Sequence, residues 1–251
     1  MAQKDLSNKK EEDPEFLLGF EKLRTIIIPD LDSEYVPTEV GVLPSSIGNL
    51  RHLRYLDLSF NRHIRIAKRH RKPNQPQVLG LNHKPDAFAK RMGSLTNLRT
   101  LVISECQNLE SLPSCNMTTL ETLDISDCPK LDLMGSGEGI RGLRFFGIEN
   151  SSLKALPHWL QESADTLEGL CLDNTFLQLP DGFQNFTMLP KLKIIDCPDL
   201  VSFPEGMYRL TALRELEISS DSLAERCRRE EGEDWSKIAH VPKIILYGRI
   251  I

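Results

Sequence analysis

The sequence lacks the features that mark membrane-spanning and secreted proteins. Aromatic residues make up only 6% of the 251 positions, and no apolar run is long enough to cross a bilayer. The N-terminal stretch MAQKDLSNKKEEDPE is polar and contains no apolar segment of the kind that a secretory signal requires. These absences predict a cytoplasmic protein with no membrane span.

Groups that carry catalysis or hold a cofactor are also missing. The six cysteines form no C-x-x-C pair and no metal-like grouping with histidine, so they are interpreted as small buried hydrophobic side chains in a reducing compartment. The six histidines are scattered, and no local signature places a nucleophile beside a base and an orienting acid. We therefore expect no enzyme, no metal and no cofactor.

The charge balance disfavours a further class of partner. The formal net charge is -5, which favours neither nucleic acid nor an anionic membrane as the partner of the whole chain. With 40% hydrophobic and 27% charged residues, the composition is ordinary for a globular chain with one sizeable core.

What the sequence does contain is a recurring pattern of leucines. The stretch LRHLRYLDLSFN (50–61) spaces its leucines by three and then by two, and the closing Leu-x-Leu has the two-residue period of a strand. The first residue of each such pair is here called the marker residue. The markers are Ile26, Leu56, Leu101, Leu123, Phe146, Leu170, Leu192, Leu216 and Ile244. From 101 to 216 the steps are 22, 23, 24, 22 and 24 residues, within the period of leucine-rich repeats.

Stacking of the repeats explains the pattern. One repeat cannot bury its leucines alone, whereas stacked repeats place every marker beside its counterpart in a parallel sheet. A second motif, Leu-Pro or Phe-Pro at 43–44, 112–113, 156–157, 179–180 and 203–204, gives the returning segment its own inward anchor. The predicted fold is an α/β leucine-rich repeat solenoid, a horseshoe with a parallel β-sheet on the concave face and loops and short helical or 3-10 turns on the convex face.

The same pattern predicts the organisation of the chain. We expect a flexible segment at 1–15 and a single repeat domain of about ten turns at 16–251. The 45-residue step from Leu56 to Leu101 is interpreted as two periods, with a degenerate repeat at 62–94 centred on Leu79 and Leu81. A C-terminal cap is expected at 222–251, with Trp235 packed under it.

Small residues recur at the strand ends. The position of Asn61 is held in other repeats by Cys106, Cys128 and Cys197, where a small side chain can meet otherwise unpaired backbone groups. Three residues after the marker stands the serine row, which contains Ser59, Ser104, Ser126 and Ser219. Because these serines share one position in four repeats, they are interpreted as a feature of the repeat and not as catalytic serines.

Three phrases carry a resemblance to a known family. LPSSIGNLRHLRYLDLSFN, the C-P-x-L of CPKL and CPDL, and above all the ending RCRREEGEDWSKIAHVPKIILYG resemble the C-terminal leucine-rich repeat region of plant intracellular nucleotide-binding immune receptors of the coiled-coil class. The resemblance covers roughly residues 16 to 251. No G-x-x-x-x-G-K-[ST] loop is present, so nucleotide binding is not carried over to this chain.

The resemblance implies a protein-protein interaction domain that holds such a receptor inactive and helps it to recognise pathogen effectors. The implied partners are an effector or a guarded host protein, and the nucleotide-binding domain of the same receptor if that domain lies upstream. An alternative is a free-standing intracellular leucine-rich repeat scaffold or adaptor in signalling. A third, weaker alternative is an enzyme inhibitor, since a horseshoe can also occlude an active site.

Side chains that surround the buried leucines would form the binding surface on the concave face. The arginine row stands two residues before the markers, the central row one residue after them and the distal row four residues after them. Aromatic residues in a concave surface are typical contact anchors. The candidate contact residues are Arg54, Arg99, Arg144 and Arg214 of the arginine row; Asp57, Val102, Asp124, Lys193 and Glu217 of the central row; Phe60, Glu105, Asp127, Asn150, Asn174 and Asp196 of the distal row; and Tyr55 and Phe145, which directly precede their markers.

Two interpretations of the charged rows stay open. The basic and acidic rows could pair with each other across neighbouring strands, each pair contributing about 0.2 to 1 kcal/mol, or they could contact a partner of complementary charge. The basic segment RHIRIAKRHRK (62–72) is also open: it could be a solvated loop, a phosphate-binding patch or a nuclear-localisation signal, which would add the nucleus as a compartment. By the family resemblance it could instead contact an adjacent domain.

Overall fold

The computed structural model describes residues 22–27, 47, 50–59, 95–112, 117–135, 140–176 and 178–251. Its strands are β1 (Thr25–Ile27), β2 (Tyr55–Asp57), β3 (Thr100–Ser104), β4 (Thr122–Ser126), β5 (Phe145–Ser151), β6 (Gly169–Thr175), β7 (Lys191–Ile195), β8 (Glu215–Ser219), β9 (Lys243–Leu246) and β10 (Arg249–Ile250). Its helical elements are the 3-10 helices η2 (His158–Ser163), η3 (Asp181–Asn185) and η4 (Glu205–Arg209), and the α-helices α2 (Asp221–Arg226) and α3 (Trp235–Ile238).

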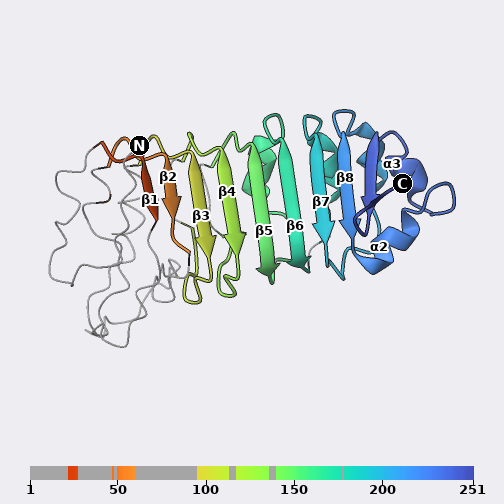
Figure 1. Cartoon of the computed structure of the whole chain (residues 1–251), viewed down its shortest axis with the longest axis horizontal. Coiled ribbons are helices and arrows are strands. Elements are labelled where there is room, and N and C mark those ends of the chain that lie inside the picture. Colours follow the sequence, from red (N-terminus) through yellow and green to blue (C-terminus); the bar gives the residue numbers. More distant parts are fainter. Residues whose placement is uncertain are drawn as a thin grey trace, which may run out of the picture.

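The described strands form one sheet whose order is the order of the chain (Figure 1). Neighbouring strands pair in parallel from β1 to β9, and β10 returns antiparallel to β9. The register places each marker opposite the next, so that Leu56 pairs with Ile26 on one side and with Leu101 on the other. The same alignment continues through every strand to Ile244. The predicted alignment of the markers is confirmed.

The core lies behind the sheet as one continuous file of apolar side chains. All nine markers are buried, with at most 3% of any of them exposed. The leucines three residues before the markers, such as Leu53, Leu98 and Leu120, are buried in the same cluster. The change of spacing from three to two therefore marks the point where the chain enters the strand, and both sets of leucines point into the core.

Short helical turns lie on the opposite side of the sheet from the viewer in Figure 1. The 3-10 helices η2, η3 and η4 each begin directly after the proline of a Leu-Pro or Phe-Pro motif, at Pro157, Pro180 and Pro204. Proline suits this place because its fixed φ leads into a helical turn and its missing N–H removes a donor that the first turn would leave unpaired. The predicted short turns on the convex side are confirmed for these three repeats.

Buried thiols satisfy backbone groups where the chain leaves the strands. The Sγ of Cys106 donates to the carbonyl of Leu58 at 3.2 Å, and the Sγ of Cys197 donates to the carbonyl of Leu172 at 3.5 Å. Each acceptor lies on the preceding repeat, as the sequence pattern predicts. The expectation that the cysteines are buried is wrong for Cys171, which is half-buried on the open face of the sheet because its position follows a marker by one residue.

The sheet passes directly from β2 to β3. Leu56 and Leu101 are paired, so the 45-residue step between them is a single step in the sheet. The stretch around Leu79 lacks the lead leucines that anchor the other strands in the core. The predicted flexible segment at 1–15, degenerate repeat at 62–94 and basic segment at 62–72 lie outside the described residues.

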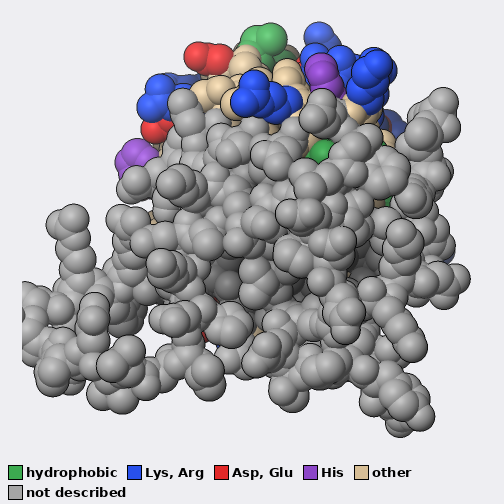
Figure 2. All heavy atoms as spheres, turned by 90° about the vertical axis from the view of Figure 1, so that its left-hand side faces the viewer, with side chains coloured by type: hydrophobic (Ala, Val, Ile, Leu, Met, Phe, Trp, Pro, Cys, Tyr) green, Lys and Arg blue, Asp and Glu red, His purple; other side chains and the backbone are tan. Residues whose placement is uncertain are grey.

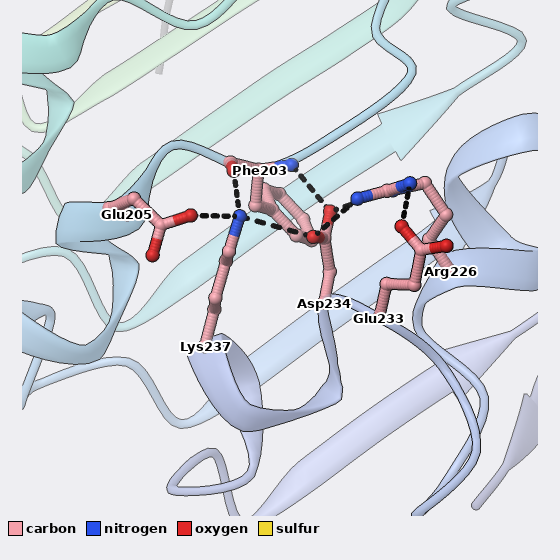
Figure 3. A network of polar contacts seen from close by, with 6 residues as sticks. All are labelled: Phe203, Glu205, Arg226, Glu233, Asp234 and Lys237. Carbon is pink, nitrogen blue, oxygen red and sulfur yellow. Dashed lines mark hydrogen bonds and ion pairs between the residues drawn. The ribbon is translucent and has the colours of Figure 1, made fainter.

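A network of charged side chains closes the C-terminal end of the stack (Figure 3). The carboxylate of Asp234 is fully buried and accepts hydrogen bonds from the Phe203 N–H at 2.8 Å and from the Arg226 guanidinium at 3.1 Å. The ammonium group of Lys237 pairs with Asp234 at 3.1 Å, with Glu205 at 2.8 Å and with the Phe203 carbonyl at 2.7 Å. Burial alone would raise the pKa of Asp234, but the hydrogen bonds from Arg226, Phe203 and Lys237 outweigh it and lower the pKa.

This network joins the chain around α3 to the Phe-Pro motif of an earlier repeat. Trp235, the first residue of α3, is half-buried and packs against the core, as expected for a residue under a cap. The boundaries of the cap at 222–251 stay a prediction. No helix within the described ranges is both long and apolar enough to traverse a membrane.

Candidate protein-binding face

The face of the sheet that points away from the core is open in the described part of the chain. Side chains alternate between the two faces of a strand, so residues one before, one after and three after each marker share this open face. The residues directly before the markers are here called the proximal row, which contains Tyr55, Thr100, Thr122, Phe145, Gly169, Lys191, Glu215 and Lys243. The proximal, central and serine rows together are here called the sheet face.

The arginine row lies along the edge where the strands begin. The Arg54 N–H donates to the Arg24 carbonyl at 2.8 Å, and the Arg99 N–H donates to the Arg54 carbonyl at 2.9 Å, so these arginines stand on successive rungs. Lys22 and Arg51 are also exposed near this corner. Figure 2 shows Lys, Arg and His side chains gathered along the top of the molecule at this end. Arg24 and Arg54 form no ion pair with a described residue.

Farther along this row two arginines are neutralised by glutamates of the same row. The Arg99 guanidinium pairs with Glu121 at 2.7 Å, and the Arg144 guanidinium binds both carboxylate oxygens of Glu168 at 2.8 and 2.9 Å. Of the two open interpretations, these two arginines follow the one in which charges pair across neighbouring strands, but their partners are glutamates of the arginine row itself and not residues of the central or distal row. These side chains are about half exposed, so each pair contributes about 0.2 to 1 kcal/mol.

A groove follows this edge between the two arginine–glutamate pairs. Its volume is about 490 Å³, and its lining includes Arg99, Glu121, Arg144, Glu168 and the exposed Met188. The two arginines and the two glutamates of the groove neutralise one another, and Asp165 adds one further carboxylate to its lining.

The distal row lies where the chain turns away from the sheet, and five of its candidate contact residues have a left-handed backbone. The φ values are 54° for Glu105, 53° for Asp127, 49° for Asn150, 44° for Asn174 and 46° for Asp196. Asparagine and aspartate adopt this conformation with less strain than other residues with a Cβ, which explains the composition of the row. The Asn150 amide also donates to Asp127 at 2.9 Å, and the Asn174 amide donates to Asn150 at 2.5 Å.

On β7, β8 and β9 the charges of the sheet face are compensated. The Lys193 ammonium lies 2.8 Å from the Glu217 carboxylate. Glu215 lies between two lysines, 3.8 Å from Lys191 and 3.0 Å from Lys243. The hydrogen bond that Lys193 donates to Glu217 raises the pKa of Lys193, and the hydrogen bond that Lys243 donates to Glu215 lowers the pKa of Glu215, as expected for groups that favour each other's charged forms.

On β2 to β6 the sheet face carries carboxylates without basic partners among the described residues. Asp57 accepts hydrogen bonds from the Ser59 N–H at 2.9 Å and from the Tyr55 hydroxyl at 3.4 Å. For Glu149, burial and then the charge of Asp173 raise the pKa, with Asp127 and Asp124 adding to the effect. For Asp173, burial and the charge of Asp196 raise the pKa, against the opposing effect of Lys193.

Two glycines leave space for neighbouring side chains in the middle of the sheet face. A Cβ on Gly147 would lie 2.4 Å from the Asp124 carboxylate, and a Cβ on Gly169 would lie 2.7 Å from the Phe145 ring. The carboxylate and the ring therefore lie across positions that only glycine leaves free. The Phe145 side chain remains 43% exposed beside them. Burial raises the pKa of the neighbouring Cys171 thiol.

The structure distributes the candidate contact residues over three places. Tyr55, Phe145 and the central-row residues Asp57, Val102, Asp124, Lys193 and Glu217 lie on the sheet face, the four arginines lie on the edge where strands begin, and the distal row lies on the opposite edge. Phe60 lies outside the described residues. Sequence reasoning missed Glu121, Glu168, Glu149 and Asp173, although the repeat period alone places the first two in the arginine row and the last two in the serine row.

Comparisons with known proteins identify the fold. No family model and no curated protein matches the sequence. Among solved structures, the leucine-rich repeat domain of the type III effector XopL superposes with a TM-score of 0.50 at 18% identity, over 81% of this chain and 71% of that chain. The chain folds as a leucine-rich repeat solenoid.

Two further solenoids are more distant. A leucine-rich repeat protein of Leptospira interrogans matches with a TM-score of 0.48 at 15% identity, over 98% of this chain and 65% of that chain. An internalin of Listeria monocytogenes matches with a TM-score of 0.38 at 15% identity, over 80% of this chain and 65% of that chain.

Within the described residues of the solenoid, no group of three or more His, Cys, Asp or Glu side chains is placed to hold a metal ion.

Proposed function

We propose that this solenoid is the protein-recognition region of a plant intracellular immune receptor of the coiled-coil class. In this role the sheet face binds a pathogen effector or a guarded host protein, and one flank contacts the nucleotide-binding domain of the same receptor and helps to hold it inactive. The receptor acts in the cytoplasm, with the nucleus as an alternative compartment. The chain itself carries the binding surface and no catalytic group.

The observation that carries this proposal is the ending RCRREEGEDWSKIAHVPKIILYG, which resembles the corresponding segment of those receptors. In the structure, Arg226, Asp234 and Lys237 of this segment form the buried network at the end of the stack. The segment that carries the resemblance therefore contains the residues that close the C-terminal end of the solenoid. The uncovered sheet face, with an exposed aromatic ring and uncompensated carboxylates, supports a role in binding protein.

The rival is a free-standing scaffold, and the transcript upstream of the Met1 codon separates the two. We expect an in-frame nucleotide-binding domain there that contains G-x-x-x-x-G-K-[ST]. An in-frame stop codon upstream, with no such domain, contradicts the receptor proposal and favours the scaffold.

The same receptor allows a test of the surface. Alanine at Phe60, Glu105, Asp127 and Phe145 is expected to reduce cell death triggered by the cognate effector, because these residues are candidate contacts. The matched control replaces four exposed residues away from the sheet face, Asp165, Asp199, Tyr208 and Glu231, and should respond as the unchanged receptor does. An undiminished response of the first variant, at equal protein level, places the contact elsewhere.

A further inference from the structure

The stack itself does not require charge on the sheet face, so the contrast between its two parts is informative. On β7 to β9, the described lysines of the sheet face each have a carboxylate within 4 Å. On β2 to β6, Asp124, Glu149 and Asp173 form no ion pair with a described residue. On β7 to β9 the lysines form ion pairs within the sheet face, whereas on β2 to β6 these three carboxylates have no ion-pair partner among the described residues.

The carboxylates without a described ion-pair partner lie around one position on β5. Gly147 pairs with Asp124 on β4 and with Cys171 on β6, at a strand spacing of about 4.8 Å. Phe145 and Glu149 stand two residues before and after Gly147 and point to the same face. Gly147 therefore has no side chain of its own, and the Asp124 carboxylate lies across it. Phe145 and Glu149 stand at its two ends, and the Cys171 thiol lies on its other side.

A third acidic group extends this arrangement. Asp173 pairs directly with Glu149, so two like charges face each other across neighbouring strands. Such a pair is unfavourable in the free protein, and the repulsion is relieved when a cation comes between the carboxylates. The ring of Phe145 adds attraction for a cation that lies over its face within about 6 Å.

We propose that the sheet face between β4 and β6 binds a basic segment of the partner protein, with an arginine or lysine side chain seated on the Asp124 carboxylate above Gly147, between Phe145 and Glu149. This inference rests on the proposed function of the sheet face as a protein-binding surface and adds the charge class of its partner. The same carboxylates repel nucleic acid and acidic proteins. The Lys193–Glu217 pair forms the boundary of the basic-segment site toward the C-terminus.

Random peptides can supply a ligand while the natural partner is unidentified. A phage library of short random peptides is panned on the immobilised 251-residue chain, and each selected clone is then measured on two variants. One is D124N/E149Q/D173N, which removes the uncompensated charges. The other, D165N/D199N/E231Q, makes the same change in net charge at exposed positions away from the sheet face.

We expect clones that bind the first variant about tenfold more weakly, bind the control variant normally and contain more Arg and Lys than Asp and Glu. For the strongest of these as a synthetic peptide, replacing arginine by citrulline should weaken binding to the unchanged chain about tenfold, and added salt should weaken the parent peptide. The citrulline measurement does not depend on the folding of any variant. Far-UV circular dichroism of both variants checks their fold.

Clones that depend on the three carboxylates but are acidic or uncharged overturn the inference, as does a selection in which no clone distinguishes the two variants. Either result leaves the immune-receptor proposal standing, because that proposal does not specify the charge of the effector. Conversely, a transcript without a nucleotide-binding domain contradicts the receptor proposal and leaves a measured preference for basic peptides intact.

Discussion

Replacing Asp234 by alanine should destabilise the C-terminal end of the solenoid. The Asp234 carboxylate is the common acceptor for the Phe203 N–H, the Arg226 guanidinium and the Lys237 ammonium group. Without it, the Phe203 N–H is buried without an acceptor, and two cations lose their shared partner. Lys237 is only 13% exposed in its side chain, so water cannot fully replace the lost carboxylate.

The size of the effect follows from what remains unpaired. A buried N–H without an acceptor costs about 1 to 3 kcal/mol, and breaking a buried ion pair by removing one partner costs about 3 to 5 kcal/mol. The Arg226 side chain is 34% exposed and can regain water, so we expect the lower end, a loss of about 3 kcal/mol of unfolding free energy for D234A. D234N keeps an acceptor for the Phe203 N–H and should lose about half as much.

The assay is equilibrium urea unfolding followed by far-UV circular dichroism, with hydrogen exchange measured by mass spectrometry to locate the change. Because repeats contact only their neighbours, faster exchange should concentrate at 203–209 and 226–238 and fade toward β5. The matched control is E233Q, since the Glu233 side chain also pairs with Arg226 but is 75% exposed and should contribute less than about 1 kcal/mol. Equal stability of D234A and E233Q would refute the reasoning.

The pH dependence of the unfolding free energy provides an independent test of the role of Asp234. The folded-state pKa of Asp234 lies below its ordinary value of 3.8, so its stabilisation is fully present above that pH. It is lost as the pH falls from 3.8 through the folded-state pKa. The unchanged chain should therefore lose stability in this acid window more steeply than D234N does.

Two further predictions concern the edge and the centre of the sheet face. Glu105 holds a φ of 54°, whereas the other left-handed candidate contacts of the distal row are Asp or Asn, so E105N should raise the unfolding free energy by about 0.5 to 1 kcal/mol in the urea assay. An unchanged or lower value contradicts the strain argument. The pKa of Glu149 is raised above 4.5 by burial and by Asp173, so its penalty is absent below pH 4.5 and grows as the pH rises through the folded-state pKa. E149Q should remove this loss of stability at rising pH and be about 0.2 to 1 kcal/mol more stable than the unchanged chain at neutral pH. Thermal unfolding of both chains at acid and neutral pH measures this, and an equal change of stability with pH in both chains would contradict the prediction.

The positions of the strands could be predicted from the sequence because the buried leucines obey a strict spacing. Leu101 and Leu123 each follow a lead leucine by three residues, and the next apolar residue follows by two. Only a strand satisfies the two-residue spacing with both residues buried, and only stacking buries them in a chain of short strands. The alignment of the markers follows from these two requirements.

The step from Leu56 to Leu101 shows what counting residues leaves open. The length of the step predicts a degenerate repeat around Leu79, which lies outside the described residues, and β2 pairs directly with β3. The stretch around Leu79 lacks the lead leucines that hold the other strands against the core. The degenerate repeat therefore stays a prediction that spacing alone supports.

Charges on the open rows were harder to interpret because their meaning depends on neighbours one repeat away. Arg99 and Glu121 are separated by 22 residues yet form a pair at 2.7 Å, while Asp124 has no described basic partner. The distal row also combines two causes that sequence cannot separate, since Asp127 suits a left-handed backbone and equally suits a binding surface. Only the register and the backbone angles distinguish these causes.

The same register explains how one solenoid can provide both stability and recognition. Residues that point into the core are confined to apolar side chains by burial, and the distal row is confined by its backbone, whereas the proximal, central and serine rows are bound by neither requirement. Charge on those three rows is therefore free to serve a partner. Since β7 to β9 show that lysine fits the proximal and central rows as readily as carboxylate does, the lack of described basic side chains in these two rows on β2 to β6 is a property of the surface and not of the fold.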